Sequence, residues 1–567
     1  MHPYRVLWYL LAFLPWTSAF CPLHGPVFPA PKDLASSSVF QAALRNLTIA
    51  YDTGLASTSG AIAVQIFASD SSVPLFEYYR DGTTLSNTTG VKKVDGDSIW
   101  RIASISKLVT VYLLLKEVGD AYWNVPVTDV IPELKGNVKW RENEVDFVKW
   151  DDVTLGALAG QISGVVNDLV ALEGANPLMD PTIQEQLGLP PLPEEEKPPC
   201  MVSADPAIGF TCSREEFFAA LDSRQPVFHA NTKPIYSSTP FIILGYALES
   251  IAGKSFGDCL QVVIDALGLA GTSLEAPDPS RAVIPYDLAS TGFLRKSGEA
   301  GPTGGLFSSI NDLSKLGRSI LNSTFLSPNT TRAWLKPVSF TSDMRSAVGR
   351  PWEVYRVDTT SSRGVIDIFG KGGDWGVYHT WLGLVPDYNI GFVSAVGGEG
   401  DKDWLSGQIL DIVLPALEEA AREQADAAYA GTYRAPGGLN STMTLSTKAG
   451  LPGLGVEQWI SNGTNILPVI SELTGESLTP ETFRLLPTNL ERKSRNGTME
   501  IAWRTVASSS QPGEGLSALS ACGSWFNVDG TSYGRYAFDE ILFTLGPNGK
   551  AVKTSPRAFK VELRKGS

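Results

Sequence analysis

The chain has 567 residues, 43% of them hydrophobic, so it is long enough to bury more than one hydrophobic core in about two to four domains. A formal net charge of −14 and a pI near 5.0 argue against nucleic acids and anionic membranes as partners. The cysteines show no Cys-x-x-Cys spacing and no two histidines have ligand spacing. We therefore expect neither a metal nor another cofactor.

The N-terminus has the pattern of a secretory signal. His2 and Arg5 precede an apolar run from Val6 to Trp16, and the small residues Thr17-Ser18-Ala19 follow at the expected cleavage position. The run is too short and too interrupted by proline to span a membrane, and no later stretch is long enough. We predict a signal peptide at residues 1–19 and a secreted protein; a buried N-terminal helix is the alternative.

Glycosylation sequons and cysteines fit passage through a eukaryotic secretory pathway. Asn-x-Ser/Thr occurs at Asn46, Asn87, Asn322, Asn329, Asn440, Asn462 and Asn496. We predict that these asparagines lie at the surface and carry glycans. Cys200 and Cys212 follow a Pro-rich stretch and are the predicted disulfide pair, whereas the sequence does not pair Cys21, Cys259 and Cys522.

The first half of the chain predicts mixed α and β structure. In chain order the expected elements are a helix at 37–50, a strand at 61–67, its hairpin partner at 76–80, a buried helix after residue 107 and a helix at 153–159. The stretch 166–234 is less regular and contains a run rich in proline and glutamate at 190–199. We interpret it as an inserted flap.

The second half changes character near residue 428. Before that point we expect a helix at 241–251, a Gly-rich loop at 301–309 entering a helix near 310, strands at 377–384 and 390–396 joined by a turn, and a helix at 404–427. After it, short alternating runs at 442–446, 455–460, 499–506, 540–545 and 559–563 predict a separate antiparallel β domain.

Ser104 and Lys107 stand three residues apart at the start of the long apolar run. On a helix these positions share a face, so the amine lies beside the hydroxyl. A serine hydroxyl becomes a nucleophile only when a neighbouring group takes its proton, and a partly desolvated lysine has the lowered pKa that this requires. The alternative for this pair alone is a helix cap followed by a surface lysine.

Two further motifs give this pair a context. Together with Tyr236-Ser237-Ser238 and Lys371-Gly372-Gly373, the chain resembles the serine β-lactamases and penicillin-binding proteins, whose signatures are Ser-x-x-Lys, Tyr-x-Asn and Lys-Thr-Gly. The order and spacing match the AmpC-like (class C) branch and its esterase, D-aminopeptidase and transesterase relatives, and with the predicted signal they suggest a secreted, fungal-type member.

The resemblance implies the fold. We expect an α/β (α+β) sandwich in which helices flank an antiparallel sheet and a helical lobe is inserted between the strands. This domain would cover residues 20–425, with the flap at 166–234. A C-terminal all-β domain resembling lipocalins would cover residues 426–567.

The resemblance also implies roles for individual residues. Ser104 would be the nucleophile that forms an acyl-enzyme, activated by Lys107, and Tyr236 would share the work of general base and protonate the leaving group. Lys371 would bind a substrate carboxylate or support Tyr236, and Gly373 would let the substrate pass close to the strand. The backbone N–H groups of Ser104 and Asp374 would form the oxyanion hole. Trp375 and Tyr378 would either line the pocket or pack in the core.

Two residues depart from the motifs. Ser238 replaces the asparagine of the second motif, and Gly372 replaces the hydroxyl-bearing middle residue of the third. Both changes remove polar contacts to an acylamino, carboxylate-bearing ligand, so we expect an ester or amide hydrolase rather than a β-lactamase proper. D-peptides, small esters, β-lactams and secondary-metabolite intermediates remain open as substrates.

Three other functions are alternatives to an ester or amide hydrolase that acts through Ser104. An acyltransferase or transesterase would use the same acyl-enzyme with an alcohol in place of water. A non-catalytic binding or assembly protein could use the same fold. A Ser-His-Asp hydrolase has little support, because Gly-x-Ser-x-Gly is missing and His379 follows the third motif in a predicted strand.

Overall fold

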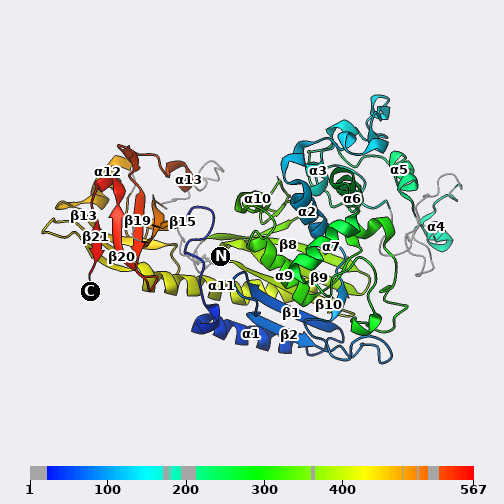
Figure 1. Ribbon diagram of the computed structural model, residues 1–567, viewed down its shortest axis with the longest axis horizontal. Coiled ribbons are helices and arrows are strands. Elements are labelled where there is room, and N and C mark those ends of the chain that lie inside the picture. The colour runs from blue at the N-terminus through cyan, green and yellow to red at the C-terminus, as the bar shows by residue number, and fades with distance from the viewer. Residues whose placement is uncertain are drawn as a thin grey trace, which may run out of the picture. The chain divides into compact units, whose positions relative to one another are not determined.

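The computed structural model describes residues 22–169, 178, 180–191, 193, 212–358, 364–474, 477–493, 497–507 and 523–566. The chain divides into two compact units. One consists of Lys32–Val357 and Ile366–Leu417, and the other of Met1–Pro31, Asp358–Val365 and Glu418–Ser567. Figure 1 shows the mixed helices and strands of the first unit and the predominantly β structure of the second.

The larger unit is built on an eight-stranded sheet with the order β2-β1-β10-β9-β8-β7-β6-β5. Its registers are antiparallel, as in the pairing of Ile62 with Val396 and of Gly373 with Thr380. The strands are β1 (Ala61–Ala68), β2 (Phe76–Arg80), β5 (Ser339–Phe340), β6 (Ser346–Val348), β7 (Glu353–Asp358), β8 (Val365–Trp375), β9 (Tyr378–Val385) and β10 (Ile390–Gly397).

Helices cover both faces of this sheet. The helices up to the end of this unit are α1 (Ser38–Gly54), α2 (Ile105–Val118), α3 (Leu155–Ala159), α4 (Pro181–Leu187), α5 (Arg214–Asp222), α6 (Thr239–Ala252), α7 (Phe256–Leu267), α8 (Gly301–Gly304), α9 (Ile310–Leu321), α10 (Pro328–Trp334) and α11 (Lys402–Tyr429), and only some of them contact the sheet. On one face, Tyr51 of α1 donates a hydrogen bond to the carbonyl of Leu405 at the start of α11. On the other, Gly317 of α9 lies against Phe67 of β1. Every residue of β1 is therefore buried, which explains why all of its residues except Gln65 are apolar.

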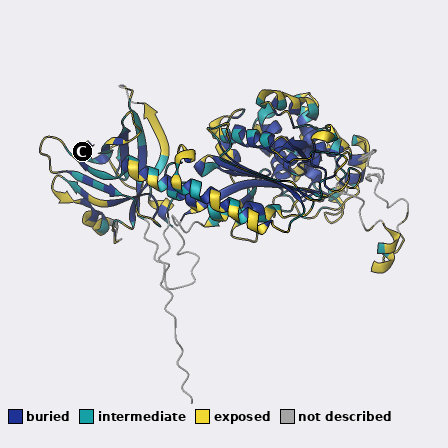
Figure 2. Ribbon diagram, turned by 90° about the horizontal axis from the view of Figure 1, so that it is seen from below, coloured by how far each residue is buried: buried dark blue, intermediate teal, exposed yellow. Residues whose placement is uncertain are grey.

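The helices that follow the first two motifs form the centre of the core. Residues 105–115 of α2 are all buried, and so are the first ten residues of α6. Figure 2 shows this continuous buried interior in dark blue. A helix that is buried on all sides is surrounded by protein, so Ser104 and Ser238, which directly precede α2 and α6, stand at the starts of helices packed in the core.

The segment 301–309, which was expected to be a Gly-rich loop, contains a short helix and a strand. Gly301–Gly304 forms the short helix α8, and Phe307–Ser309 forms a strand, β4, before α9 begins. β4 pairs with β3 (Ile99–Arg101), which directly precedes the first motif. This two-stranded sheet brings the Gly-rich segment beside α2, a long-range pairing that local sequence does not show.

The second unit contains a closed antiparallel β-barrel. Its sheet order is β12-β11-β21-β20-β19-β16-β15-β13-β14, and an additional pairing of β12 with β13 closes the ring. The strands are β11 (Gly431–Arg434), β12 (Thr442–Ser446), β13 (Leu454–Ser461), β14 (Thr464–Asn465), β15 (Phe483–Lys493), β16 (Met499–Ala507), β19 (Glu540–Leu545), β20 (Ala551–Pro556) and β21 (Leu563–Lys565). Two helices, α12 (Ile466–Thr474) and α13 (Ser524–Asn527), and the small hairpin of β17 (Ser532–Tyr533) and β18 (Tyr536–Ala537) accompany it.

The predicted fold class is thus confirmed for both parts, while some local boundaries were wrong. The strand expected at 559–563 is instead a short 3-10 helix at Arg557–Phe559 followed by β21, and β15 and β20 were not predicted. In the second half of the chain, the expected strands begin at residue 377 and leave out β8, an eleven-residue strand that carries Lys371 and Gly373. Its glycines and charged residues interrupt the apolar pattern from which a strand is predicted. A strand whose two faces are both covered by the rest of the unit also shows no alternation of buried and exposed residues.

Several sequence predictions concern residues outside the described ranges. They are the signal peptide at 1–19, Cys21, Cys200, Cys522, Asn496 and residues 170–177, 179, 192 and 194–211 of the 166–234 flap, whose helices α4 and α5 are described. Cys212 takes part in a disulfide and Cys259 is a buried free thiol. The pairing of Cys200 with Cys212 stays a prediction.

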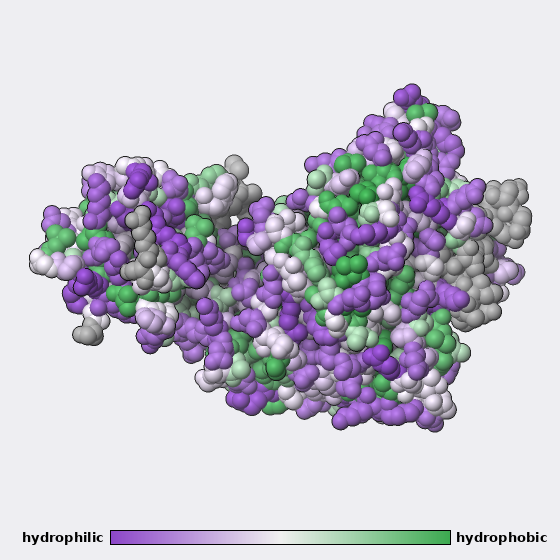
Figure 3. All heavy atoms as spheres, viewed as in Figure 1, coloured by the Kyte–Doolittle hydropathy of each residue, from purple (hydrophilic) through white to green (hydrophobic). Residues whose placement is uncertain are grey.

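The described sequons lie where glycans would have access. Asn46, Asn87, Asn322, Asn329, Asn440 and Asn462 are all exposed. The side-chain amide of Asn322 donates to the carbonyl of Ser69 at 2.7 Å, so this sequon is engaged in the structure. Hydrophilic residues are spread over the face shown in Figure 3, with smaller hydrophobic groups between them. In the described part of the chain, no helix has the length and apolar character needed to cross a membrane.

Candidate active site

Ser104 occupies the position just before α2, but it does not cap that helix. Its side chain makes no capping hydrogen bond to the backbone. Ala103, which precedes it, has a φ of 45°, in the left-handed region that residues with a Cβ rarely adopt. Such backbone strain is typical of functional sites. The hydroxyl instead accepts hydrogen bonds from the side chains of Lys107 and Tyr236.

Lys107 reaches Ser104 from one turn along α2. Its Nζ donates to Ser104 Oγ at 2.9 Å and to the carbonyl of Thr303 in α8 at 2.8 Å. The side chain is buried, and this burial is the main reason why the pKa of Lys107 lies below its ordinary value, with the charge of Lys371 adding to the effect. The sequence alternative of a surface lysine is therefore wrong.

Tyr236 reaches Ser104 from the opposite side. Its hydroxyl donates to Ser104 Oγ at 2.6 Å. The Nζ atoms of Lys107 and Lys371 each lie 5.1 Å from the centre of the Tyr236 ring. Tyr236 is 42% exposed as a residue, but the surrounding protein desolvates its hydroxyl, which opposes ionisation of the phenol; the positive charges of Lys107 and Lys371 outweigh this and lower the pKa of Tyr236.

Lys371 is buried in β8 and is paired with Glu353, a residue of β7. Lys371 Nζ lies 2.5 Å from Glu353 Oε1 and also donates to the carbonyl of Gly372 at 2.8 Å. The second carboxylate oxygen of Glu353 accepts the backbone N–H of Gly372 at 3.0 Å. Although burial alone would lower it, the nearby carboxylate and Tyr236 hold the pKa of Lys371 above its ordinary value. Lys371 is thus a permanent cation beside Tyr236.

Gly373 allows β8 to approach the backbone of Ile102, two residues before Ser104. A Cβ at this position would meet the carbonyl oxygen of Ile102 at 2.2 Å, which is closer than real Cβ contacts allow. The position therefore requires glycine because the backbone before Ser104 crosses directly beside it. Gly372 is less restricted, since its Cβ would meet the Trp381 ring at 3.1 Å.

Other residues predicted for the site have structural partners. The Asp374 carboxylate accepts hydrogen bonds from Lys402 at 2.8 Å and pairs with His379 at 2.7 Å; burial alone would raise its pKa, but these contacts lower it. Ser238 is nearly buried at the start of α6, and its N–H donates to the carbonyl of Asn167. The partners described for Ser104 Oγ are Lys107 and Tyr236, so a triad through His379 has no support in this geometry.

Trp375 and Tyr378 pack in the interior. The Trp375 ring lies 4.2 Å from the guanidinium carbon of Arg101, and Tyr378 donates to the carbonyl of Val283 at 2.8 Å. Both side chains are buried. Of the two roles expected from the sequence, Trp375 and Tyr378 therefore pack in the core and do not line the pocket.

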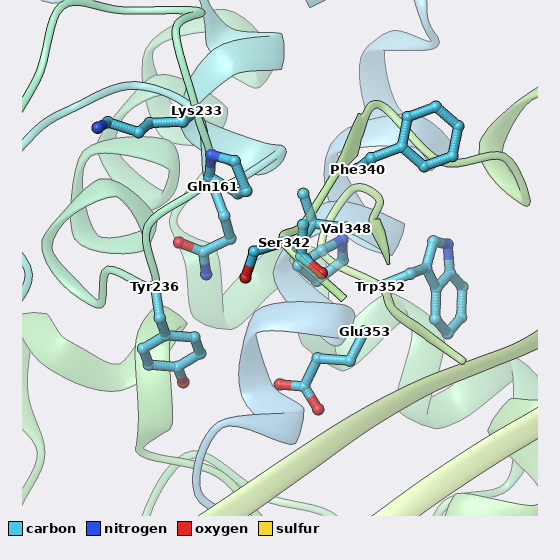
Figure 4. Close-up of a pocket in the computed structure, with 11 residues that line it drawn as sticks. Gln161, Lys233, Tyr236, Phe340, Ser342, Val348, Trp352 and Glu353 are labelled. Carbon is cyan, nitrogen blue, oxygen red and sulfur yellow. The ribbon is translucent and has the colours of Figure 1, made fainter. Parts of the chain in front are cut away.

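A cavity of about 510 Å³ adjoins Tyr236 and Glu353 (Figure 4). Its wall is formed by Gln161, Lys233, Pro234, Tyr236, Phe340, Thr341, Ser342, Val348, Pro351, Trp352 and Glu353. The side-chain oxygen of Gln161 accepts the N–H of Ser237 at 2.7 Å, which fixes the segment that carries Tyr236. No group of three or more metal-ligating side chains was found in the described ranges.

Comparison with known proteins decides the family. The family model described as "Beta-lactamase" matches residues 75–407, and a model described as "Beta-lactamase-like-like, C-terminal domain" matches residues 421–567. The chain belongs to the β-lactamase family. The first match contains all three motifs, and the second covers the barrel.

The relatives extend this result to the full chain. A "Beta-lactamase-like protein" of Arthroderma benhamiae is 31% identical over 95% of both chains. The "Probable hydrolase clz13" of Cochliobolus lunatus is 28% identical over 80% of this chain and 77% of its own. Among solved structures, a D-stereospecific amidohydrolase from Streptomyces sp. aligns with a TM-score of 0.46 and 18% identity, over 65% of this chain and 97% of its own.

Sequence reasoning missed three contributors to this β-lactamase-family site: Glu353, Gln161 and Thr303. Glu353 follows a buried tryptophan in an ordinary strand pattern, and Thr303 contributes only its backbone carbonyl. No local signal marks them, because each acts through a partner far away in the sequence. The left-handed φ of 60° at Gln161 lies in the loop 160–165 and is likewise invisible in the sequence.

Proposed function

We propose that this protein is a serine hydrolase that cleaves an ester or amide through an acyl-enzyme on Ser104. The observation that carries the proposal is the double contact to Ser104 Oγ, from Lys107 Nζ at 2.9 Å and Tyr236 Oη at 2.6 Å. A hydroxyl held between two groups of lowered pKa is set up to lose its proton.

The geometry supports a defined order of steps. Ionised Tyr236 accepts the proton of Ser104, whose oxygen forms a bond to the substrate carbonyl carbon. Lys107 and Lys371 stabilise the ionised phenol electrostatically. When the bond to the leaving group breaks, Tyr236 returns the proton to that group, and water then releases the acyl group from Ser104. The backbone N–H groups of Ser104 and Asp374 are proposed to bind the oxyanion, and such a donor contributes about a hundredfold or more in rate.

An ester or neutral amide fits the site better than a β-lactam. The second motif offers Ser238 in place of an amide side chain, and Gly372 contributes no hydroxyl. Acyl transfer to an alcohol remains the second candidate function, because the same acyl-enzyme serves it. Adding an alcohol to the reaction and measuring the ratio of ester to acid product separates the two.

The direct test is covalent labelling of the nucleophile. A fluorophosphonate probe is expected to add to Ser104, detected by intact mass and peptide mapping. Ser104→Ala should abolish the adduct. Ser106→Ala is the matched control, because Ser106 Oγ is buried and accepts the N–H of Leu306, so it is not available for reaction. An unlabelled wild-type protein, or equal labelling of Ser104→Ala, would refute the proposal.

We also propose that the protein is exported and glycosylated. The signal-like residues 1–19 and the six exposed sequons support this proposal. Expression in a eukaryotic secretory host should yield protein in the medium that loses mass on treatment with an N-glycosidase. Protein that stays in the cells, or whose mass does not change, would contradict it.

A further inference from the structure

The charged amine of Lys371 is already paired with a carboxylate inside the protein. One carboxylate oxygen of Glu353 binds its Nζ, and the other binds the backbone N–H of Gly372. Lys371 is 1% exposed, whereas the Glu353 side chain is 28% exposed. The negative member of the pair therefore faces the substrate space, and the positive member is shielded behind it.

The cavity beside Tyr236 presents this carboxylate to a ligand. Glu353 and Tyr236 both line it, and Figure 4 shows the Tyr236 hydroxyl, the Glu353 carboxylate and the Gln161 amide around one common space. Pro234, Val348, Pro351 and Trp352 supply apolar walls. A volume of about 510 Å³ is sufficient for an aromatic ring with a substituent.

Gln161 adds an unused donor to the same wall. The residue is 5% exposed, and among the described residues its Nε2 has no hydrogen-bond partner, while its oxygen accepts the N–H of Ser237. A buried N–H without a partner is destabilising, and a ligand oxygen that accepts from it would relieve this cost. The wall also contains one cation, Lys233, which is exposed and whose Nζ lies 4.0 Å from the centre of the Phe228 ring.

We propose that this cavity receives the leaving group of the substrate, and that Glu353 selects uncharged leaving groups with an oxygen acceptor for Gln161 and rejects those that carry a carboxylate. The inference rests on the proposed function, in which Tyr236 protonates the leaving group. A carboxylate in this place would lie beside Glu353 and would find Lys371 occupied. Like charges brought together at a binding surface strongly disfavour a ligand.

The reaction balances without another reagent. Ser104 Oγ forms a bond to the acyl carbon while the bond from that carbon to the alcohol oxygen breaks. The proton of Ser104 passes through Tyr236 to the alcohol oxygen. Water then restores Ser104 and releases the carboxylic acid. Only the alcohol, or the amine in an amide, has to enter the cavity beside Tyr236.

The test varies the leaving group alone. Acetate esters of 4-hydroxybenzamide and 4-hydroxybenzoate have nearly the same shape and differ by one negative charge, and 4-methylphenyl acetate lacks the oxygen acceptor. kcat/KM is measured for each from release of the phenol. In the wild type we expect the carboxamide ester to exceed the carboxylate ester by about tenfold or more. Glu353→Gln should reduce this ratio to near one.

The ratio of kcat/KM for the carboxamide ester to kcat/KM for the carboxylate ester is compared between variants. This comparison cancels the difference in intrinsic reactivity of the two esters and any general loss of rate in a variant. Glu215→Gln, an exposed change on α5, is the matched control and should leave the ratio unchanged. A ratio that persists in Glu353→Gln, or one that is changed by Lys233→Gln instead, would overturn the assignment of Glu353. A carboxamide ester bound about tenfold more weakly than the 4-methylphenyl ester would overturn the role of Gln161.

Binding to Ser104→Ala separates this inference from the proposed function. Calorimetric titration of that variant with the three esters measures affinity without turnover. If the wild type hydrolyses none of them, the proposed function fails, while the affinity ratio of carboxamide to carboxylate still tests the cavity. Equal affinities for these two esters would refute charge selection by Glu353 whether or not turnover occurs.

Discussion

The Tyr236 hydroxyl donates a hydrogen bond of 2.6 Å to Ser104 Oγ across a separation of 132 residues in the chain. The contact requires α2 and α6 to begin at adjacent points of the core. Because Lys107 donates to the same oxygen, a single atom joins two of the motifs. The predictions below follow from this arrangement and its neighbours.

Replacing Tyr236 by phenylalanine removes only the hydroxyl. We expect kcat/KM for an activated ester to fall by about 10² to 10⁴, the usual contribution of a positioned acid-base group. The thermal unfolding midpoint should change little, because the Tyr236 residue is 42% exposed and its ring is retained. Turnover at the wild-type rate would remove Tyr236 from the catalytic set.

Lys371→Met should displace the pH profile toward higher pH. The charge of Lys371 lowers the pKa of both Tyr236 and Lys107, so its removal raises both. Activity requires a deprotonated base and therefore rises with pH through this pKa. The unpaired Glu353 acts in the same direction. We expect the acidic limb of kcat/KM to move up by about one pH unit.

The matched control for this shift is Lys254→Met, an exposed lysine that pairs with Glu117. Its pH profile should coincide with that of the wild type. An acidic limb of Lys371→Met that stays in place, or that moves toward lower pH, would show that Lys371 does not set the ionisation of the base.

Gly373→Ala tests the close approach of β8 to the backbone of Ile102. A Cβ would meet the Ile102 carbonyl oxygen at 2.2 Å, so the strand or the nucleophile segment must move. We expect a loss of about 1–3 kcal/mol in the free energy of unfolding, together with a large loss of activity. Gly372→Ala faces only the Trp381 ring at 3.1 Å and should be much milder. Equal effects of the two changes in denaturant titrations and kinetics would contradict this.

Ser106→Ala separates stability from chemistry. The Ser106 hydroxyl accepts the buried N–H of Leu306 at 3.1 Å, and alanine would leave that donor without a partner. We expect unfolding to become easier by about 1–3 kcal/mol, measured by thermal or denaturant unfolding, with labelling of Ser104 preserved. Loss of labelling in a folded Ser106→Ala protein would mean that the nucleophile was assigned to the wrong serine.

The sequence determined the framework of the fold because its signals are local. Apolar runs set the helices that follow Ser104 and Tyr236 and strands such as β9 and β10, and alternation set β12. The β4 strand was missed because it exists only through pairing with β3, and the closure of the barrel depends on β12 meeting β13. Strand pairing joins distant segments and leaves little trace in either one.

The same division holds for the site. The sequence by itself determined the three motifs, and with them Ser104, Lys107, Tyr236 and Lys371. Only the tertiary structure decided that Lys371 is paired with Glu353, which turns a cation expected to bind a carboxylate into part of a neutral pair. The physical reason is that the sequence identifies a charged side chain but not its partner. The effect of that charge on a ligand depends on which opposite charge the fold places beside it.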